Sequence, residues 1–527
     1  MIKISIRFTG MMAALLLVLS GCHKDLDRFP PNDVTGSTLY GTTQGYTQVL
    51  AKVYGSMALT GNSGPSGAGD LAGIDEGTSD FLRLYWKAQE LSTDEAVVAW
   101  NDPGIQDFHN MNWSSSNPML TGLYNRCFYI ITLSNEFIRE SADDKLASRG
   151  ITGSNADAIK AMRAEARFVR AFQYWVLMDL YANPGFVKED DAIGAGGRPT
   201  QIQRAELFKF IESELKALET VLPAARSNPY GRADRAAAWA LLARMYLNAG
   251  VYTGTPNWAE AMNYSKRVID AGYSLLGNYQ HLLLADNNLN NPEAIWTLNY
   301  DGLKTKNWGG TTFLVNGSVG GDMDQTVSGL SKWGGLRTTR NLPLLFPDFT
   351  GAQDKRAQFF QQNLEIDNVS NFKDGFAVIK FRNRTRTGGF GNDPERTFSD
   401  IDFPVFRLAE MHLIYMEAAA RSNSNVATAV GYANLLRQRA YGSTSGNINS
   451  AQLTPDYVLD ERARELYWEG HRRTDLVRYG RFTDATYLWP WKGGVKNGTG
   501  VDAFRRIYPI PSTEVGSNPN IKQNPNY

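Results

Sequence analysis

The chain has 527 residues with 54 basic and 54 acidic side chains, so its formal charge is zero. A balanced chain has no bulk electrostatic attraction to nucleic acid or to an anionic membrane face, and we expect no nucleic-acid partner. Only 20% of the residues are charged, and the 49 glycines, 21 prolines and 12 tryptophans indicate a globular protein rich in loops and aromatic rings. The length leaves room for about three domains, but no segment has the composition of a linker.

The first 21 residues are predicted to be a signal peptide and not part of the fold. Lys3 and Arg7 form a basic start, and residues 11–19 form an apolar stretch too short to span a bilayer. Leu19-Ser20-Gly21-Cys22 ends it and resembles a bacterial lipoprotein signal. The resemblance implies that Cys22 becomes the lipid-bearing first residue of a mature chain, residues 22–527; a plain secretory signal is the alternative. The remaining cysteine, Cys127, lies in an apolar helical run and is predicted to be a small core residue.

Helical periodicity dominates the first half of the mature chain. After a polar tether, apolar residues recur at helical spacing over residues 42–57, 120–141, 158–181 and 205–222. The glycine-rich run 61–73 lacks the ending of a phosphate-binding loop and is predicted to be a surface loop. These helices predict an α-solenoid.

Residues 230–272 predict a helical hairpin, because each helix has a start signal, an apolar stripe along one face and a stop signal. Gly250 follows the first helix where a left-handed C-cap is expected, and Asn257 with Glu260 is typical of an N-cap. Gly272 ends the second helix. Alanines alternate with large rings on the stripes, which indicates tetratricopeptide-like packing; an ordinary helical pair is the alternative.

Between residues 273 and 403 the helical period is lost. Short apolar runs at 294–298, 311–315 and 377–381 predict loops with a few short strands, and so long an irregular insertion is usually functional. Helices return at residues 407–421, 427–441 and 457–479. In the last of these, Glu461, Glu465, Glu469 and Arg473 share one face, which we interpret as a solvated charge ladder.

Several motifs occur in one order along the chain: Arg163-Ala-Glu-Ala-Arg-Phe, Tyr230-Gly-Arg-Ala-Asp, the run from Glu461 to Gly480, and the tail from Tyr508. Together they resemble the SusD/RagB outer-membrane nutrient-binding lipoproteins. The resemblance implies a mainly α single domain of four tetratricopeptide-like helical hairpins, with an irregular ligand-binding region at about residues 58–118 and 273–403. It also implies a lipid-anchored, cell-surface protein that caps a SusC-like TonB-dependent transporter.

Residues 70–100, 302–315 and 487–494 are similar to the starch-binding branch of that family. In that branch an arc of aromatic rings holds an α-glucan with help from an Asp, an Arg and an Asn. By position, the resemblance assigns the rings to Trp100, Trp308 and Trp333. The polar contacts fall on Asp75, Arg83 and Asn101. The sequence departs from the pattern in three places: Trp308 replaces a Tyr, Val98 replaces a second Trp, and one residue is missing after Trp100.

Sugar chemistry supports the three tryptophans independently. Glucose rings have apolar C–H faces, so binding them in water takes flat aromatic surface together with forked donors and acceptors. Trp100, Trp308 and Trp333 stand beside Gly or Asn in loop-like sequence. The tryptophans on helical stripes, Trp175, Trp239 and Trp258, are instead predicted to pack in the core.

The predicted function is therefore capture of starch and maltooligosaccharides and delivery to the transporter, without catalysis. Another glycan on the same scaffold is one alternative, and a glycoside hydrolase using Asp94-Glu95 or Asp75-Glu76 is another. The five histidines lack metal-ligand spacing. The segment Asp286 to Glu293 offers oxygen ligands for a structural Ca²⁺, but we favour an Asn-rich loop without metal. No cofactor is expected.

Overall fold

The computed structural model describes residues 36–527 apart from residue 68 and residues 193–196. Cys22 and the predicted signal peptide lie outside the described residues. Helices dominate and the strands are short, which confirms the predicted mainly α class. None of the described helices combines the length and the apolar composition that crossing a membrane requires.

The helices of the first half are α2 (Gly36–Leu39), α3 (Thr43–Ala58), α4 (Phe81–Glu90), α5 (Asp107–Asn110), α6 (Pro118–Glu140), α7 (Asp143–Ser148), α8 (Gly153–Tyr181) and α9 (Arg204–Leu218). Of these, α3, α6, α8 and α9 match the four predicted segments, whereas α2, α4, α5 and α7 were not predicted. Helix α8 packs against α6, α3 and α9. Cys127 on α6 is fully buried, as predicted, and burial raises the pKa of its thiol above the usual range.

The predicted hairpin is formed by α10 (Arg235–Leu247) and α12 (Trp258–Ile269), which pack together. The side chain of Asn257 accepts a hydrogen bond from the N–H of Glu260, so the predicted N-cap is confirmed. The cap at Gly250 is wrong, because the chain forms a further short helix, α11 (Ala249–Thr253), before turning. The left-handed residue is Gly254, with φ of 80°.

The second half contains α14 (Leu408–Ser422), α15 (Val426–Tyr441), α16 (Pro455–Leu466), α17 (Arg472–Arg478) and α18 (Ser512–Ser517). The single helix predicted over residues 457–479 is wrong, because the chain breaks between α16 and α17. Trp468 has φ of 66° and Gly470 has φ of 80°, and neither value fits a right-handed helix. The break turns the ring of Trp468 into the core against Trp86, at a centroid distance of 5.1 Å.

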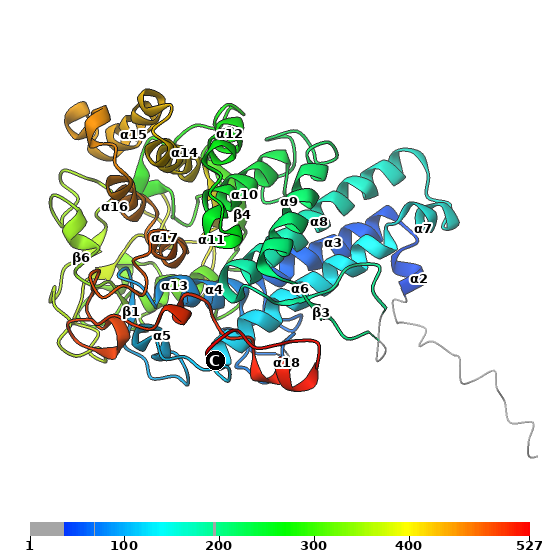
Figure 1. Cartoon of the computed structure of the whole chain (residues 1–527), viewed down its shortest axis with the longest axis horizontal. Coiled ribbons are helices and arrows are strands. Elements are labelled where there is room, and N and C mark those ends of the chain that lie inside the picture. Colours follow the sequence, from blue (N-terminus) through cyan, green and yellow to red (C-terminus); the bar gives the residue numbers. More distant parts are fainter. Residues whose placement is uncertain (1–35, 68, 193–196) are drawn as a thin grey trace, which may run out of the picture.

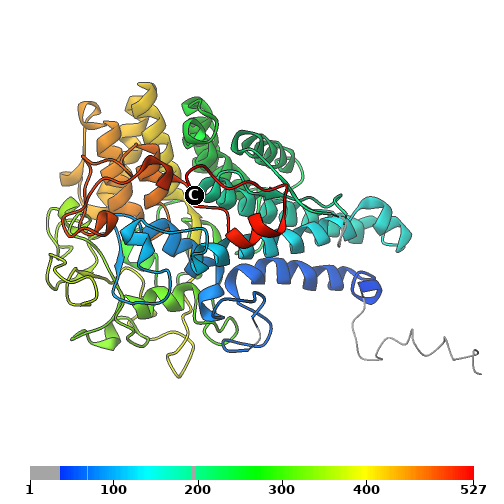
Figure 2. The ribbon, with the colours of Figure 1, turned by 60° about the horizontal axis from the view of Figure 1, so that its bottom comes forward.

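The helices form a row beside the irregular region. In Figure 1 helices α9, α10, α12, α14 and α15 follow one another along one edge, while the irregular chain around β6, β1 and α13 lies below them. Figure 2 shows the same division after rotation, with the chain near residues 300–400 gathered at the lower left. The packed pairs α6/α8, α8/α9, α10/α12 and α14/α15 give the row its solenoid character.

Short antiparallel strand pairs connect segments outside the helices. They are β1 (Val97–Val98) with β5 (Leu336–Arg337), β2 (Gly185–Phe186) with β3 (Thr200–Gln201), β4 (Ala294–Leu298) with β8 (Phe403–Arg407), and β6 (Phe359–Phe360) with β7 (Ala377–Val378). All but β2 with β3 involve the irregular region. Strand β4 covers the predicted run 294–298. The apolar run 311–315 is instead part of a helix, α13 (Gly310–Gly317), whose apolar side chains are buried all round.

The predicted solvated charge ladder is wrong, because Glu461, Glu465, Glu469 and Arg473 are all at most 3% exposed. The three glutamates face arginines from elsewhere in the chain: Arg356 pairs with Glu461 at 2.7 Å, and Arg407 bridges Glu465 and Glu469 at 2.7 Å each. Buried charges persist only when they are paired and hydrogen-bonded. The ladder is therefore an internal ionic network that joins α16 to the irregular region.

The helical-stripe tryptophans differ in burial. Trp175 is 1% exposed and belongs to the core as predicted. Trp239 and Trp258 pack on the core with only part of their surface. The indole N–H of Trp239 donates to Glu219 at 3.2 Å. The prediction that both are core residues is therefore only partly correct, because each ring packs on the core with one side and is partly exposed on the other.

Candidate functional site

Trp100, Trp333 and Trp308 form a continuous arc of three rings. The centroids of Trp100 and Trp333 are 6.4 Å apart, and those of Trp333 and Trp308 are 6.2 Å apart. Consecutive rings are inclined by 53° and 49°. All three side chains are only partly buried. We call these three residues the tryptophan arc.

Strand pairing brings the first two rings together. Trp100 follows β1 by two residues, and Trp333 precedes β5 by three, so the β1–β5 ladder sets them side by side. The indole N–H of Trp100 donates to the carbonyl of Trp333 at 3.3 Å. Gly335 lies under the Trp100 ring, where a Cβ atom would come within 2.1 Å of it. A larger residue at 335 would therefore displace the ring.

Trp308 is held by the start of α13. The carboxylate of Asp80 accepts hydrogen bonds from the N–H groups of Arg83 in α4 and of Gly310 in α13, both at 2.8 Å, and so ties two helix N-termini together. Gly310 has φ of 55°, which glycine tolerates without strain. This turn fixes the backbone of Trp308 next to α4.

Arg83 lies beneath the arc. Its Nη1 donates to the carbonyl of Trp308 at 2.9 Å, and its guanidinium lies 4.8 Å from the centroid of the Phe313 ring. Phe313 in turn packs against Trp100 at 5.9 Å. Burial lowers the pKa of Arg83, and the carboxylates of Asp75, Asp80 and Asp102 act in the opposite direction. Arg83 therefore supports the backbone of one ring and, through Phe313, the underside of another.

The other two predicted polar residues lie at the edge of this group. Asp75 is exposed, and its carboxylate accepts the N–H of Thr78 at 2.9 Å. Asn101 is exposed immediately after Trp100. All six residues assigned by resemblance therefore lie in one region. Direct contacts join only the three tryptophans and Arg83 to one another.

Sequence reasoning missed the residues that back the arc. Phe398 packs against Trp308 with centroids 4.9 Å apart, and the ammonium of Lys306 lies 6.0 Å from the Phe398 ring. The indole N–H of Trp308 donates to Ser66 at 3.2 Å. Phe398 and Ser66 are far from Trp308 in sequence, and no local pattern marked them.

The acidic pair Asp94-Glu95 is not available to a substrate. Both side chains are 3% exposed, and Asp94 forms an ion pair with Arg472 at 2.7 Å. Burial raises the pKa of Glu95 to about 8 against the opposing charge of Arg472. Glu95 accepts the N–H of Trp468 at 3.2 Å. This pair is part of the core, so it is not the catalytic pair of a hydrolase.

The segment from Asp286 to Glu293 does not fit a calcium ion. Asp286 accepts hydrogen bonds from the backbone N–H of Arg386 at 3.2 Å, and Glu293 is buried and paired with Arg407 and Arg439. The guanidinium of Arg386 also lies 3.8 Å from Asp286, so arginines pair with both carboxylates. Within the part of the chain that the structure describes, no group of three or more His, Cys, Asp or Glu side chains could hold a metal ion.

Two family profiles match the chain. The profile described as "SusD family" matches residues 348–527, and the one described as "Starch-binding associating with outer membrane" matches residues 85–247. The "Starch-binding protein SusD" of Bacteroides thetaiotaomicron is 34% identical over 98% of both chains. The chain belongs to the SusD family. The SusD-like protein P2 of Formosa agariphila is 24% identical over 97% of this chain and 98% of its own.

Solved structures share the SusD-family fold. A SusD homologue of Bacteroides thetaiotaomicron superimposes with a TM-score of 0.73 at 18% identity, covering 94% of this chain and 99% of its own. Surface glycan-binding protein A of Bacteroides fluxus gives 0.68 at 20% identity, covering 94% and 100%. The predicted family and its helical fold are thus confirmed.

Proposed function

We propose that this protein captures α-glucan, as starch or maltooligosaccharide, on the tryptophan arc. The observation that carries the proposal is the arc itself: three partly exposed indole rings in contact, on the sequence positions that the resemblance to the starch-binding branch assigns. The name of the 34% identical relative, "Starch-binding protein SusD", supports the same ligand. Asp75 and Asn101 supply exposed polar groups for sugar hydroxyls at the edge of the rings.

The inclination between rings favours a curved glycan. Successive planes differ by 53° and 49°, so the three rings do not form one flat platform. An α-glucan follows a helical turn, whereas a β-1,4-linked glucan is an extended ribbon that suits coplanar rings. The arc therefore matches the changing orientation of successive glucose rings in an α-glucan.

The expected affinity is modest. Partial burial of three rings at about 25 cal/mol per Å² and a few hydrogen bonds of roughly 1 kcal/mol each are offset by the ordering of a flexible glycan. A dissociation constant between about 1 µM and 1 mM follows. Such a site releases its ligand readily, as a protein that passes glycan onward requires.

The destination of the glycan is a SusC-like TonB-dependent transporter in this proposal. The protein lies at the cell surface, held in the outer membrane by lipid on Cys22. The description of the matched family, "Starch-binding associating with outer membrane", supports the location. The lipoprotein-like ending of the signal peptide supports the anchor.

Calorimetric titration of the mature protein with maltoheptaose and with cellohexaose tests the ligand. We expect binding of maltoheptaose and at least about tenfold weaker binding of cellohexaose. Equal affinity for the two would refute the preference for α-glucan. A reducing-end assay on the same samples should show no release of sugar, and measurable turnover abolished by Asp75→Asn would replace binding with hydrolysis.

A further inference from the structure

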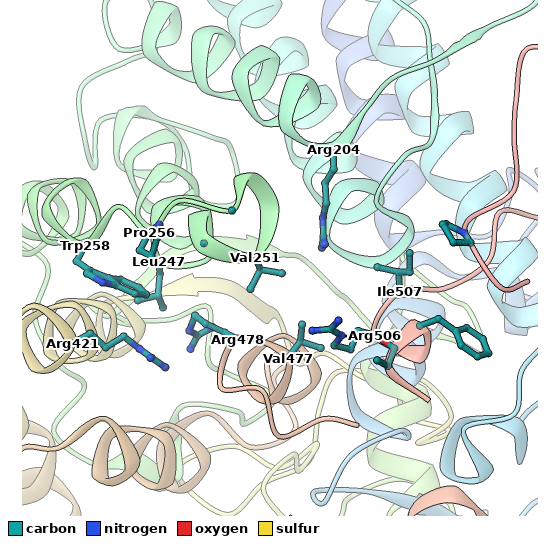
Figure 3. Close-up of a pocket in the computed structure, with 15 residues that line it drawn as sticks. Arg204, Leu247, Val251, Pro256, Trp258, Arg421, Val477, Arg478, Arg506 and Ile507 are labelled. Carbon is teal, nitrogen blue, oxygen red and sulfur yellow. Dashed lines mark hydrogen bonds between the residues drawn. The ribbon is translucent and has the colours of Figure 1, made fainter. Parts of the chain in front are cut away.

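A pocket elsewhere in the fold shares no lining residue with the tryptophan arc. It has a volume of about 610 Å³ and lies between α11, the start of α12, α17 and the segment that precedes Tyr508. Figure 3 shows it as an elongated space, with Trp258 and Arg421 at one end and Arg204, Arg506 and Ile507 at the other. We call it the arginine pocket. Its volume is in the range of small-molecule sites.

The polar side chains that line the arginine pocket are hydrogen-bond donors only. Four are arginines and the fifth is Trp258, and the remaining lining residues carry apolar side chains or none. Neither guanidinium nor indole has an acceptor. A neutral sugar needs acceptors for its hydroxyl protons, and these side chains offer none. An oxyanion, which only accepts hydrogen bonds, matches this lining.

Near one end of the pocket, three arginines lack a direct ion-pair partner in the described part of the chain. Within the described residues, Arg204, Arg473 and Arg506 form no ion pair with a carboxylate. Arg204 uses Nε and Nη2 on the carbonyls of Met178 and Asp179, each at 3.0 Å, which leaves Nη1 to donate. Burial lowers the pKa of Arg204, whereas Tyr252 and the carboxylate of Asp179 act in the opposite direction, and the charges of Arg473 and Arg506 lower it further. An anion here would relieve that repulsion.

Arg506 is the accessible member of this group. It is exposed, and its Nε donates to the carbonyl of Ala503 at 3.0 Å. Both terminal nitrogens of Arg506 are without a hydrogen-bond partner among the described residues. Figure 3 shows it beside Ile507 at the same end as Arg204. At this end of the pocket, as far as the described residues go, Nη1 of Arg204 and both terminal nitrogens of Arg506 are therefore free to donate hydrogen bonds to a ligand.

At the opposite end of the pocket, the arginines pair with carboxylates of the protein. Arg478 donates to both oxygens of Glu417, at 2.7 Å each, and to Asp475 at 2.8 Å, so its charge is satisfied within the protein. Arg421 also donates to Glu417, at 2.9 Å, while its Nη2 is buried without a partner. Between the two ends lie the apolar side chains of Val251 and Val477.

We propose that the arginine pocket binds a small organic carboxylate. The carboxylate group lies between Arg204 and Arg506, and the apolar body lies against Val251, Val477 and Ile507. This ligand is neither the glycan nor part of it, because the donor-only lining disfavours neutral sugars. The site is independent of the tryptophan arc.

Calorimetric titration of the full mature protein with sodium hexanoate, in dilute salt, tests the site. We expect saturable binding of hexanoate. Hexanol, which has the same body without charge, and inorganic phosphate, which has charge without the body, should both bind at least about tenfold more weakly. Absence of hexanoate binding, or equal binding of phosphate, would overturn the proposal.

Two matched variants locate the binding. Arg506→Gln should weaken hexanoate about tenfold or more, because it removes a charge-assisted donor. Arg340→Gln removes the same charge from a surface ion pair with Glu365 and should change the affinity by less than about twofold. Equal weakening by both variants would mean nonspecific attraction. Trp308→Ala should leave hexanoate binding unchanged, whatever it does to maltoheptaose.

Discussion

Removing the Trp308 ring tests whether this side chain contacts ligand or serves only to pack the core. A sugar stacked on one face of an indole covers roughly 60 Å², about a third of the surface that a large ring can bury. At about 25 cal/mol per Å² this contributes about 1.5 kcal/mol, so Trp308→Ala should weaken maltoheptaose about tenfold. The ring contacts Trp333 and Phe398 and is only partly buried, so unfolding should become easier by about 1 kcal/mol or less.

Trp175→Ala provides the matched control. Trp175 is 1% exposed and stacks on Phe172 at 5.7 Å, so truncation should reduce the free energy of unfolding by about 3 to 5 kcal/mol. Urea denaturation gives the stability of each variant, and titration with maltoheptaose, corrected for the folded fraction, gives the affinity. If Trp308→Ala loses as much stability as Trp175→Ala while its folded fraction binds normally, the ring is structural and the proposed site is wrong.

Three further predictions concern charge and location. Burial would raise the pKa of Glu461, but Arg356 and the neighbouring arginines lower it to about 2. The ion pair therefore stabilises the fold at pH values above the ordinary pKa, and this stabilisation is lost as pH falls toward 2. Arg356→Met should therefore reduce the unfolding free energy by about 3 to 5 kcal/mol in urea at pH 7, and by clearly less at pH 3; an equal loss at both would contradict the electrostatic reasoning. Burial raises the pKa of Glu95 to about 8, so the protonated side chain adds to the free energy of unfolding below the ordinary pKa, and this stabilisation is lost as pH rises through 8. Glu95→Gln should therefore raise the melting temperature more at pH 8 than at pH 5. A change in melting temperature that does not depend on pH would contradict this reasoning. Cys22→Ala, expressed without the transporter, should leave the outer-membrane fraction, and retention there would show that lipid is not the anchor.

Local patterns identified the longer helices, such as α3, α8 and α14, because the information that specifies them lies within a few residues. Asn257 caps α12 because its own side chain reaches the N–H of Glu260. The same spacing rule failed for Glu461, Glu465 and Glu469, since periodicity shows that they share a face but not what covers it. Their partners are Arg356 in the irregular region and Arg407 at the end of β8, and these partners determine that the face is buried and not solvated.

The candidate site shows the same limit. The six residues could be assigned by resemblance, and β1–β5 pairing explains why Trp100 and Trp333 meet. Sequence alone could not give the 6.4 and 6.2 Å spacings, or show that Arg83 supports Trp308 from beneath. It also could not distinguish Trp175 from Trp258, because both lie on helical stripes and only tertiary packing leaves the second beside a pocket.

The turn between α16 and α17 has a consequence for how the polypeptide matures. The N–H of Gly470 donates to Glu90 at 2.7 Å, and Arg472 pairs with Asp94, so contacts essential to the interior span about 380 positions. Such distant pairings form late, because a long loop must close before they are gained. The regions matched by the two family profiles should not be separable modules, and we expect neither to be stable when expressed alone. A polypeptide crossing the envelope should accordingly stay sensitive to proteases until residues 468–475 have been translocated and have found α4.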